Sequence, residues 1–122
     1  MITGTPYRNK NLIEAIRKTH RGIRESTLRK IDRRTRRLIV VSAREYIQDC
    51  LDDGESEETA ELVTIRHELS EGHVKWLQSW DCAGGSAAEE IQQDVLTKIC
   101  EEFHLHQNDL EACHVQLRQS DA

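Results

Sequence analysis

Proline is almost absent from this sequence. The single proline is Pro6, so the rest of the 122-residue chain is free of the residue that interrupts helices. Charged residues make up 32% of the chain and aromatic residues 4%. Long charged side chains are typical of helical surfaces, and so few aromatic residues argue against a β-sandwich. We therefore expect an all-α fold, a compact bundle of five or six helices that forms one domain over residues 1–122.

Local signals divide the first part of this bundle into short, basic helices. Residues 1–8 are expected to be a flexible leader. A first helix is expected to begin near Asn9 or Asn11, because either asparagine can cap it. Gly22 would end that helix, and Ser26 could cap a second one.

The apolar core is expected to come from later, longer helices in an acidic C-terminal body. Gly72 is expected to bend or split one of them, and a glycine pair marks an internal turn at 82–85. Asn108 or Asp109 would start a short last helix. The three core helices are predicted near 43–53, 57–79 and 87–105.

The stretch Leu38–Val41 has two interpretations. Ser42 and Glu45 have the spacing of a capping box, which would start a helix at Ala43 and leave Leu38–Val41 as a short strand. The same residues can instead continue one long helix from Ser26 to Asp53. We favour the long helix, because a lone strand needs a partner and no other segment has a strand pattern.

The strand alternative depends on one run of residues: Leu38–Val41 and Ser42, then Tyr46-Ile47, Leu51, Gly54 and Glu61-Leu62-Val63. This pattern resembles the strand–helix–helix of the ribbon–helix–helix antitoxins. The resemblance implies a dimeric DNA-binding repressor that also wraps a toxin. Two features depart from the family. Its strand alternates, with polar side chains that contact the groove, whereas Leu38–Val41 is apolar throughout, and residues 1–37 have no place in its usual short form.

Charge divides the sequence after Arg37. Residues 1–37 hold twelve of the 17 Lys+Arg and three acidic residues, a net charge of +9. Residues 38–122 hold the other five basic residues and nineteen acidic ones, a net charge of −14, which together give the chain its −5. Such asymmetry bears on what a protein binds rather than on what it catalyses.

The basic segment 17–37 is the strongest binding signal. Its ten cations, with Leu28 and Ile31 interleaved, would suit a helix that lies on the phosphates of a nucleic acid. No base-reading motif is present, so we expect binding to tolerate many sequences. An acidic protein surface, of the same or another subunit, is the alternative partner. The candidate contact residues are Arg29, Lys30, Arg33, Arg34, Arg36 and Arg37.

Two functions of different classes follow. The first is a small non-catalytic regulator of gene expression that contacts nucleic acid through segment 17–37. The second is a protein-binding inhibitor or anti-activator that docks on a regulatory protein and blocks its dimerisation or DNA binding. Its candidate anchors are Trp76 and Trp80, four residues apart and expected on one helix face, with Leu77 beside them. The alternative places one tryptophan in the core. We also expect a homodimer, because oppositely charged ends of two copies would attract.

Cysteines and histidines near the C-terminus raise the question of a metal site. Cys100 and His104 are four residues apart on a predicted helix, and His106, Cys113 and His114 follow. Thiolates and imidazoles at such spacing can bind zinc. The chain has no Cys-x-x-Cys pair, however, and Cys113 and His114 are neighbours that point in different directions on a helix. We therefore expect core thiols and surface imidazoles, and no metal or other cofactor.

Sequence motifs for catalysis and for targeting are also missing. No nucleophile elbow, phosphate-binding glycine loop or His-Glu-x-x-His occurs, so we do not expect an enzyme. No stretch approaches the roughly 18 apolar residues of a membrane span, and the basic N-terminus lacks the apolar core of a signal peptide. A cytoplasmic protein with reduced cysteines and no membrane partner is expected.

Overall fold

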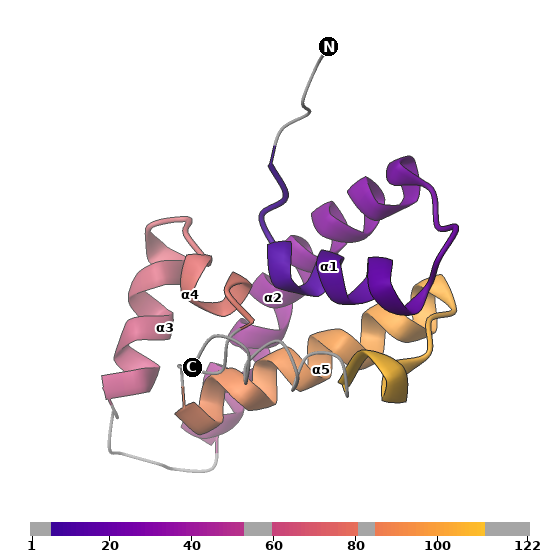
Figure 1. Cartoon of the computed structure of the whole chain (residues 1–122). Helices are drawn as coiled ribbons and strands as arrows, with labels where there is room; N and C mark the ends of the chain where they lie inside the picture. The colour runs from indigo at the N-terminus through magenta and orange to yellow at the C-terminus, as the bar shows by residue number, and fades with distance from the viewer. Residues whose placement is uncertain (1–5, 53–59, 81–84, 112–122) are drawn as a thin grey trace.

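The structure is a computed structural model, and it describes residues 6–52, 60–80 and 85–111. Within these ranges every regular element is a helix, so the predicted all-α fold is confirmed (Figure 1). A short helical segment at 107–111 follows five labelled helices. These are α1 (Lys10–Thr19), α2 (Glu25–Asp52), α3 (Ala60–Ser70), α4 (Lys75–Gln78) and α5 (Gly85–Phe103).

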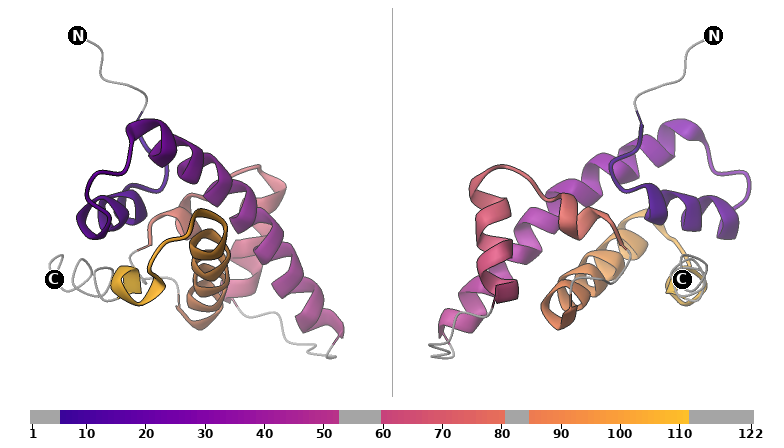
Figure 2. Two further views of the ribbon diagram at one scale, coloured as in Figure 1. Left: turned by 90° about the vertical axis from the view of Figure 1, so that its right-hand side faces the viewer. Right: turned by 60° about the vertical axis from the view of Figure 1, so that its left-hand side comes forward.

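Helix α2 is the central helix of the fold. Its buried side chains recur three and four residues apart, which is the spacing that places them on one helix face. The most extensive packing is between α2 and α5, and α3 and α4 also contact α2. Helix α1 lies along the first half of α2 (Figure 2). Fully buried aliphatic side chains of these helices form the core, among them Ile16, Ile31, Ile39, Ile65, Ile91 and Ile99.

The strand alternative at Leu38–Val41 is wrong. All four residues lie inside α2, which runs for 28 residues, so the strand that the ribbon–helix–helix resemblance requires is not present there. Ser42 does not start a helix either. Its Oγ is buried in the middle of α2 and donates a hydrogen bond to Asp94 Oδ2 of α5 at 2.7 Å. Packing of one α2 face against α5 therefore outweighs the local strand preference of three consecutive β-branched residues.

The predicted first helix is α1, but its cap differs from the prediction. The helix begins directly after Asn9, whose side chain makes no capping hydrogen bond. The carboxylate of Asp32 caps it instead, because it accepts the backbone N–H of Arg8 at 3.1 Å and that of Asn9 at 2.9 Å. A negative charge there also complements the positive end of the α1 dipole.

Glycines with positive φ occupy the turns before α2 and α4, at the two positions where the sequence predicts that a helix ends or is interrupted. Gly22 has φ +91° in the turn that follows α1, and Gly72 has φ +75° after α3. The His73 N–H donates to the Glu68 carbonyl at 2.8 Å, which closes the end of α3, so Gly72 splits the helix predicted at 57–79. Helix α2 begins at Glu25, which places Ser26 inside its first turn rather than at a cap.

Some predicted features lie outside the described residues: 1–5 of the leader, 82–84 of the turn, Gly54, Cys113 and His114. The end of the predicted leader is held in place, because Tyr7 and Arg8 contact α2. Among the helices that the structure describes, none combines the length and the apolar character needed to cross a bilayer.

Candidate functional site

The outer face of α2 is basic. Lys30, Arg33, Arg37 and Arg44 are all exposed and follow one side of the helix, opposite its buried face. At a rise of about 1.5 Å per residue they extend over roughly 21 Å. No carboxylate of the described residues forms an ion pair with any of the four. We call these four residues the α2 stripe.

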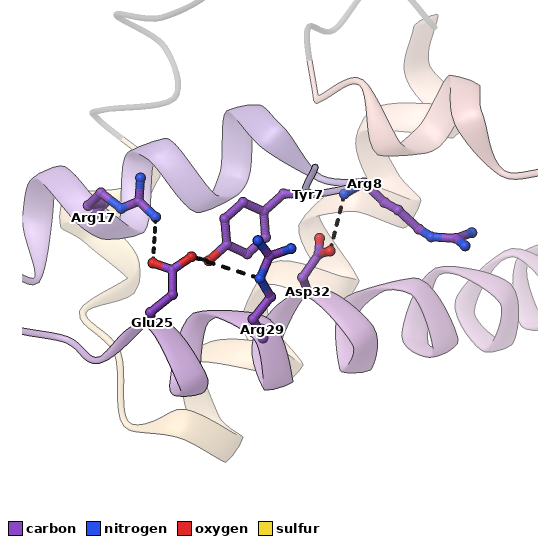
Figure 3. Close-up of polar contacts among 6 residues, drawn as sticks. All are labelled: Tyr7, Arg8, Arg17, Glu25, Arg29 and Asp32. Carbon is purple, nitrogen blue, oxygen red and sulfur yellow. Dashed lines mark hydrogen bonds and ion pairs between the residues drawn. The ribbon is translucent and has the colours of Figure 1, made fainter. Parts of the chain in front are cut away.

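Arg29, by contrast, interacts with other side chains of the same chain. Its guanidinium carbon lies 4.0 Å from the centre of the Tyr7 ring, and its Nε lies 3.8 Å from Glu25 Oε1. The Tyr7 hydroxyl donates to the same carboxylate, and Arg17 Nη2 donates to its other oxygen at 3.0 Å (Figure 3). The hydrogen bond from Tyr7 is the main cause that lowers the pKa of Glu25, and the positive charges of Arg17 and Arg29 add to it.

Arg34 and Arg36 flank the α2 stripe and also have partners. Arg34 Nε lies 2.9 Å from Glu102 Oε2 of α5, in a pair of which both side chains remain about two-fifths exposed. Such an exposed pair contributes about 0.2–1 kcal/mol. Arg36 Nη2 donates weakly to the Gly72 carbonyl at 3.4 Å. Of the six predicted contact residues, Lys30, Arg33 and Arg37 are therefore the three that pair with no described acceptor.

Two adjoining hollows lie between α2 and the turn that joins α3 to α4. The first, which we call the α2 groove, has a volume of about 480 Å³ and contains apolar side chains between its arginines. The second, which we call the Arg8 hollow, has a volume of about 450 Å³. No described carboxylate lines either of them. The basic residues that line them are Arg34, Arg36, Arg37 and Arg44 in the first, and Arg8, Arg36 and Lys75 in the second.

Three of these cations were missed by sequence reasoning. Arg44 lies beyond the basic segment 17–37, Arg8 falls in the predicted leader, and Lys75 precedes the first tryptophan. Contacts distant in sequence bring Arg8 into place, because its backbone N–H is held by Asp32 while its side chain extends away from the Tyr7 contacts (Figure 3). Positive charge was the only signal in the sequence for these three residues. Charge does not indicate which cations lie close together in the folded chain.

The shared face predicted for Trp76 and Trp80 is wrong. Helix α4 ends at Gln78, and Trp80 lies beyond it with φ +57°, outside the helical register. Trp80 is 2% exposed and its Nε1 donates to Asn9 Oδ1 at 3.0 Å, while Leu77 is 1% exposed. Two of the three predicted interface anchors are thus core residues, and Trp76 is half-buried.

The described members of the predicted cysteine and histidine set, Cys100, His104 and His106, do not form a metal-binding group. Burial raises the pKa of the Cys100 thiol to about 11, so this cysteine stays protonated at neutral pH. His106 stacks on His20 with ring centroids 5.2 Å apart. Within the part of the chain that the structure describes, no three His, Cys, Asp or Glu residues are grouped so that they could hold a metal ion.

Comparisons with known proteins identify no relative: no protein-family model, no curated protein and no solved structure matches this chain. Function must therefore be inferred from the charges and contacts of the chain itself. The α2 stripe and the α2 groove together form a surface on which an extended polyanion can lie.

Proposed function

We propose that this protein is a non-catalytic regulator of gene expression that binds the phosphate backbone of nucleic acid through the α2 stripe. One observation carries the proposal. The four cations of the stripe are exposed on one helix face and have no carboxylate partner among the described residues. Arginine and lysine on such a face neutralise phosphates and release condensed counterions, which supplies most of the sequence-independent affinity.

The dimensions and the composition of the surface favour a duplex. A stripe of roughly 21 Å corresponds to about six base-pair steps of 3.4 Å. Among the described residues that line the α2 groove, the one aromatic ring is the His73 imidazole. No Phe, Tyr or Trp is present there to form the series of stacked bases on which single-strand binding usually depends. Contacts restricted to phosphates would make binding tolerant of sequence.

Binding to two DNA duplexes of unrelated sequence tests this proposal. We expect similar affinities for both in a mobility-shift titration at low salt. The double variant R33A/R37A should weaken binding roughly tenfold or more, which is at least about 1.4 kcal/mol. The matched control K18A/R21A removes two exposed cations of α1 and the turn after it, and should change affinity less than about twofold. Equal losses in both variants, or no binding at low salt, would contradict the proposal.

A second candidate function is a protein-binding inhibitor, and exposed apolar residues favour it. Val41 and Leu51 on α2 and Val63 on α3 are 44%, 51% and 46% exposed. The same side chains are available to a second copy of the chain in the predicted homodimer. If V41S/V63S abolishes capture of a single protein partner while R33A/R37A does not, the inhibitor is the better description. Sedimentation velocity at micromolar concentration tests the predicted homodimer, because it measures the oligomeric state of the protein.

A further inference from the structure

The Arg8 hollow is distinct from the α2 stripe and contains none of its residues. Its three cations come from three separate parts of the fold: Arg8 precedes α1, Arg36 belongs to α2, and Lys75 starts α4. His73 and Ser79 also line it. Its volume of about 450 Å³ lies in the range of small-molecule sites, about 300–1,000 Å³.

A buried amide in this hollow is without an acceptor. Gln78 lines the hollow and is only 6% exposed, and its Nε2 has no hydrogen-bond partner among the residues that the structure describes. Leaving a buried donor unpaired is unfavourable, because the donor has lost its hydrogen bonds to water. Most buried side-chain donors in proteins are paired, so an unpaired one indicates a position where an acceptor is favoured.

Two carboxylates that contact the backbone beside these cations form hydrogen bonds outside the hollow. Asp32 accepts the backbone N–H groups of Arg8 and Asn9 and the side-chain amide of Asn9. Glu68 accepts the backbone N–H of Trp76 at 3.3 Å. Neither acid lines the hollow, so no described acid of the chain neutralises its positive charge from within.

We infer that the Arg8 hollow binds a phosphoryl group. The guanidinium forks of Arg8 and Arg36 match the oxygens of a phosphate, and Lys75 adds a third positive charge. Gln78 is part of the wall of the hollow, so its side-chain amide would be close enough to respond to a bound phosphoryl group. The phosphoryl group can come from a small phosphorylated ligand or from a nucleic-acid backbone. This inference goes beyond the proposed function, because it needs none of Lys30, Arg33, Arg37 or Arg44.

The Gln78 side-chain amide gives a direct readout. Its two N–H signals in a ¹H–¹⁵N correlation spectrum can be assigned by comparison with Gln78→Leu. We expect inorganic phosphate to shift them saturably, and sodium chloride at equal ionic strength to leave them in place. Arg36→Ala should raise the Kd for phosphate at least tenfold. Arg21→Ala is the control, because it removes an exposed arginine that lines neither hollow, and it should change that Kd less than twofold.

Two further probes identify the source of the phosphoryl group. A shift with adenosine monophosphate assigns the hollow to small phosphorylated ligands. A shift only with a duplex that lacks terminal phosphates assigns it to the backbone, and both results support a phosphoryl site. Lys75→Ala provides a second variant. Because Lys75 is exposed, this variant should weaken phosphate binding without disturbing the core. The inference is overturned if no phosphate probe shifts the amide, if chloride shifts it equally, or if Arg21→Ala weakens phosphate binding as much as Arg36→Ala. The R33A/R37A duplex titration fails or succeeds independently of these outcomes.

Discussion

At the scale of single residues, Asn9 connects three segments of the chain. Its side chain is fully buried, and its Nδ2 donates to Asp32 Oδ1 at 2.8 Å. Its Oδ1 accepts the indole N–H of Trp80 at 3.0 Å. One amide thus joins the start of α1, the N-terminal third of α2 and Trp80, which lies two residues after the end of α4. The donors and acceptors of this buried contact are matched, which is the condition under which a buried polar group stabilises a fold.

Replacing Asn9 should therefore be costly. Asn9→Ala removes the acceptor that Asn9 Oδ1 provides to the Trp80 indole N–H and a donor to the buried Asp32 carboxylate. We expect the free energy of unfolding, measured by urea denaturation, to fall by about 2–4 kcal/mol. Asn11→Ala is the matched control, because Asn11 is half-buried on the same helix and its amide donates only to the Ser79 carbonyl. Similar losses in the two variants would argue against a central role for Asn9.

The imidazole of His20 makes the fold sensitive to acid. Burial, and then the charge of His106, lower the pKa of His20 below its ordinary value of 6.5, with Asp109 opposing. The backbone N–H of His106 donates to His20 Nε2 at 3.0 Å, a bond that needs the ring nitrogen unprotonated. Because the unfolded chain takes up this proton more readily, the contribution of His20 to stability is present above pH 6.5 and is lost as the pH falls below it.

Thermal unfolding at two pH values measures this effect. We expect Tm to fall between pH 7.5 and pH 5.5 in the wild-type protein, and to fall less in His20→Gln, which cannot titrate. The comparison between the two proteins removes the contribution of the other ionisable groups. An equal fall in both would show that His20 is not the group responsible.

At the scale of elements, the spacing of apolar residues was sufficient to predict most helices, but not their ends. The pattern over 87–105 predicts α5 to within two residues at each end, because its apolar stripe is regular. The cap of α1 could not be predicted, since it comes from Asp32, which lies in a different helix. Capping residues assigned from local sequence fail where a distant side chain takes their place.

Neighbouring residues of α2 test its packing against α5. Ile39 is fully buried, whereas Val41, two positions later, is 44% exposed. In a two-residue strand repeat these side chains would share a face, but in a helix they do not. Ile39→Ala should lower the free energy of unfolding by about 2–5 kcal/mol, and Val41→Ala by less than about 0.5 kcal/mol. Comparable losses in urea denaturation would be inconsistent with a continuous α2.

At the scale of the whole molecule, the charge division of the sequence predicts where basic residues are concentrated, but not which of those cations remain available. Arg29 and Arg34 are held by Glu25 and Glu102, whereas Arg33 and Arg37 pair with no described acid. These outcomes depend on which side of α2 faces α5. The Arg8 hollow could not be predicted at all, because its three cations are far apart in the sequence and meet only in the folded chain.

The salt dependence of duplex binding tests the central claim most directly. If the α2 stripe lies on phosphates, a plot of log K against log salt concentration for the wild-type protein should have a slope of about −3 to −4, close to −0.9 for each of four contacts. R33A/R37A should make that slope shallower by about 1.8, and K18A/R21A should leave it unchanged. A slope that R33A/R37A does not alter would mean that the outer face of α2 is not where nucleic acid binds.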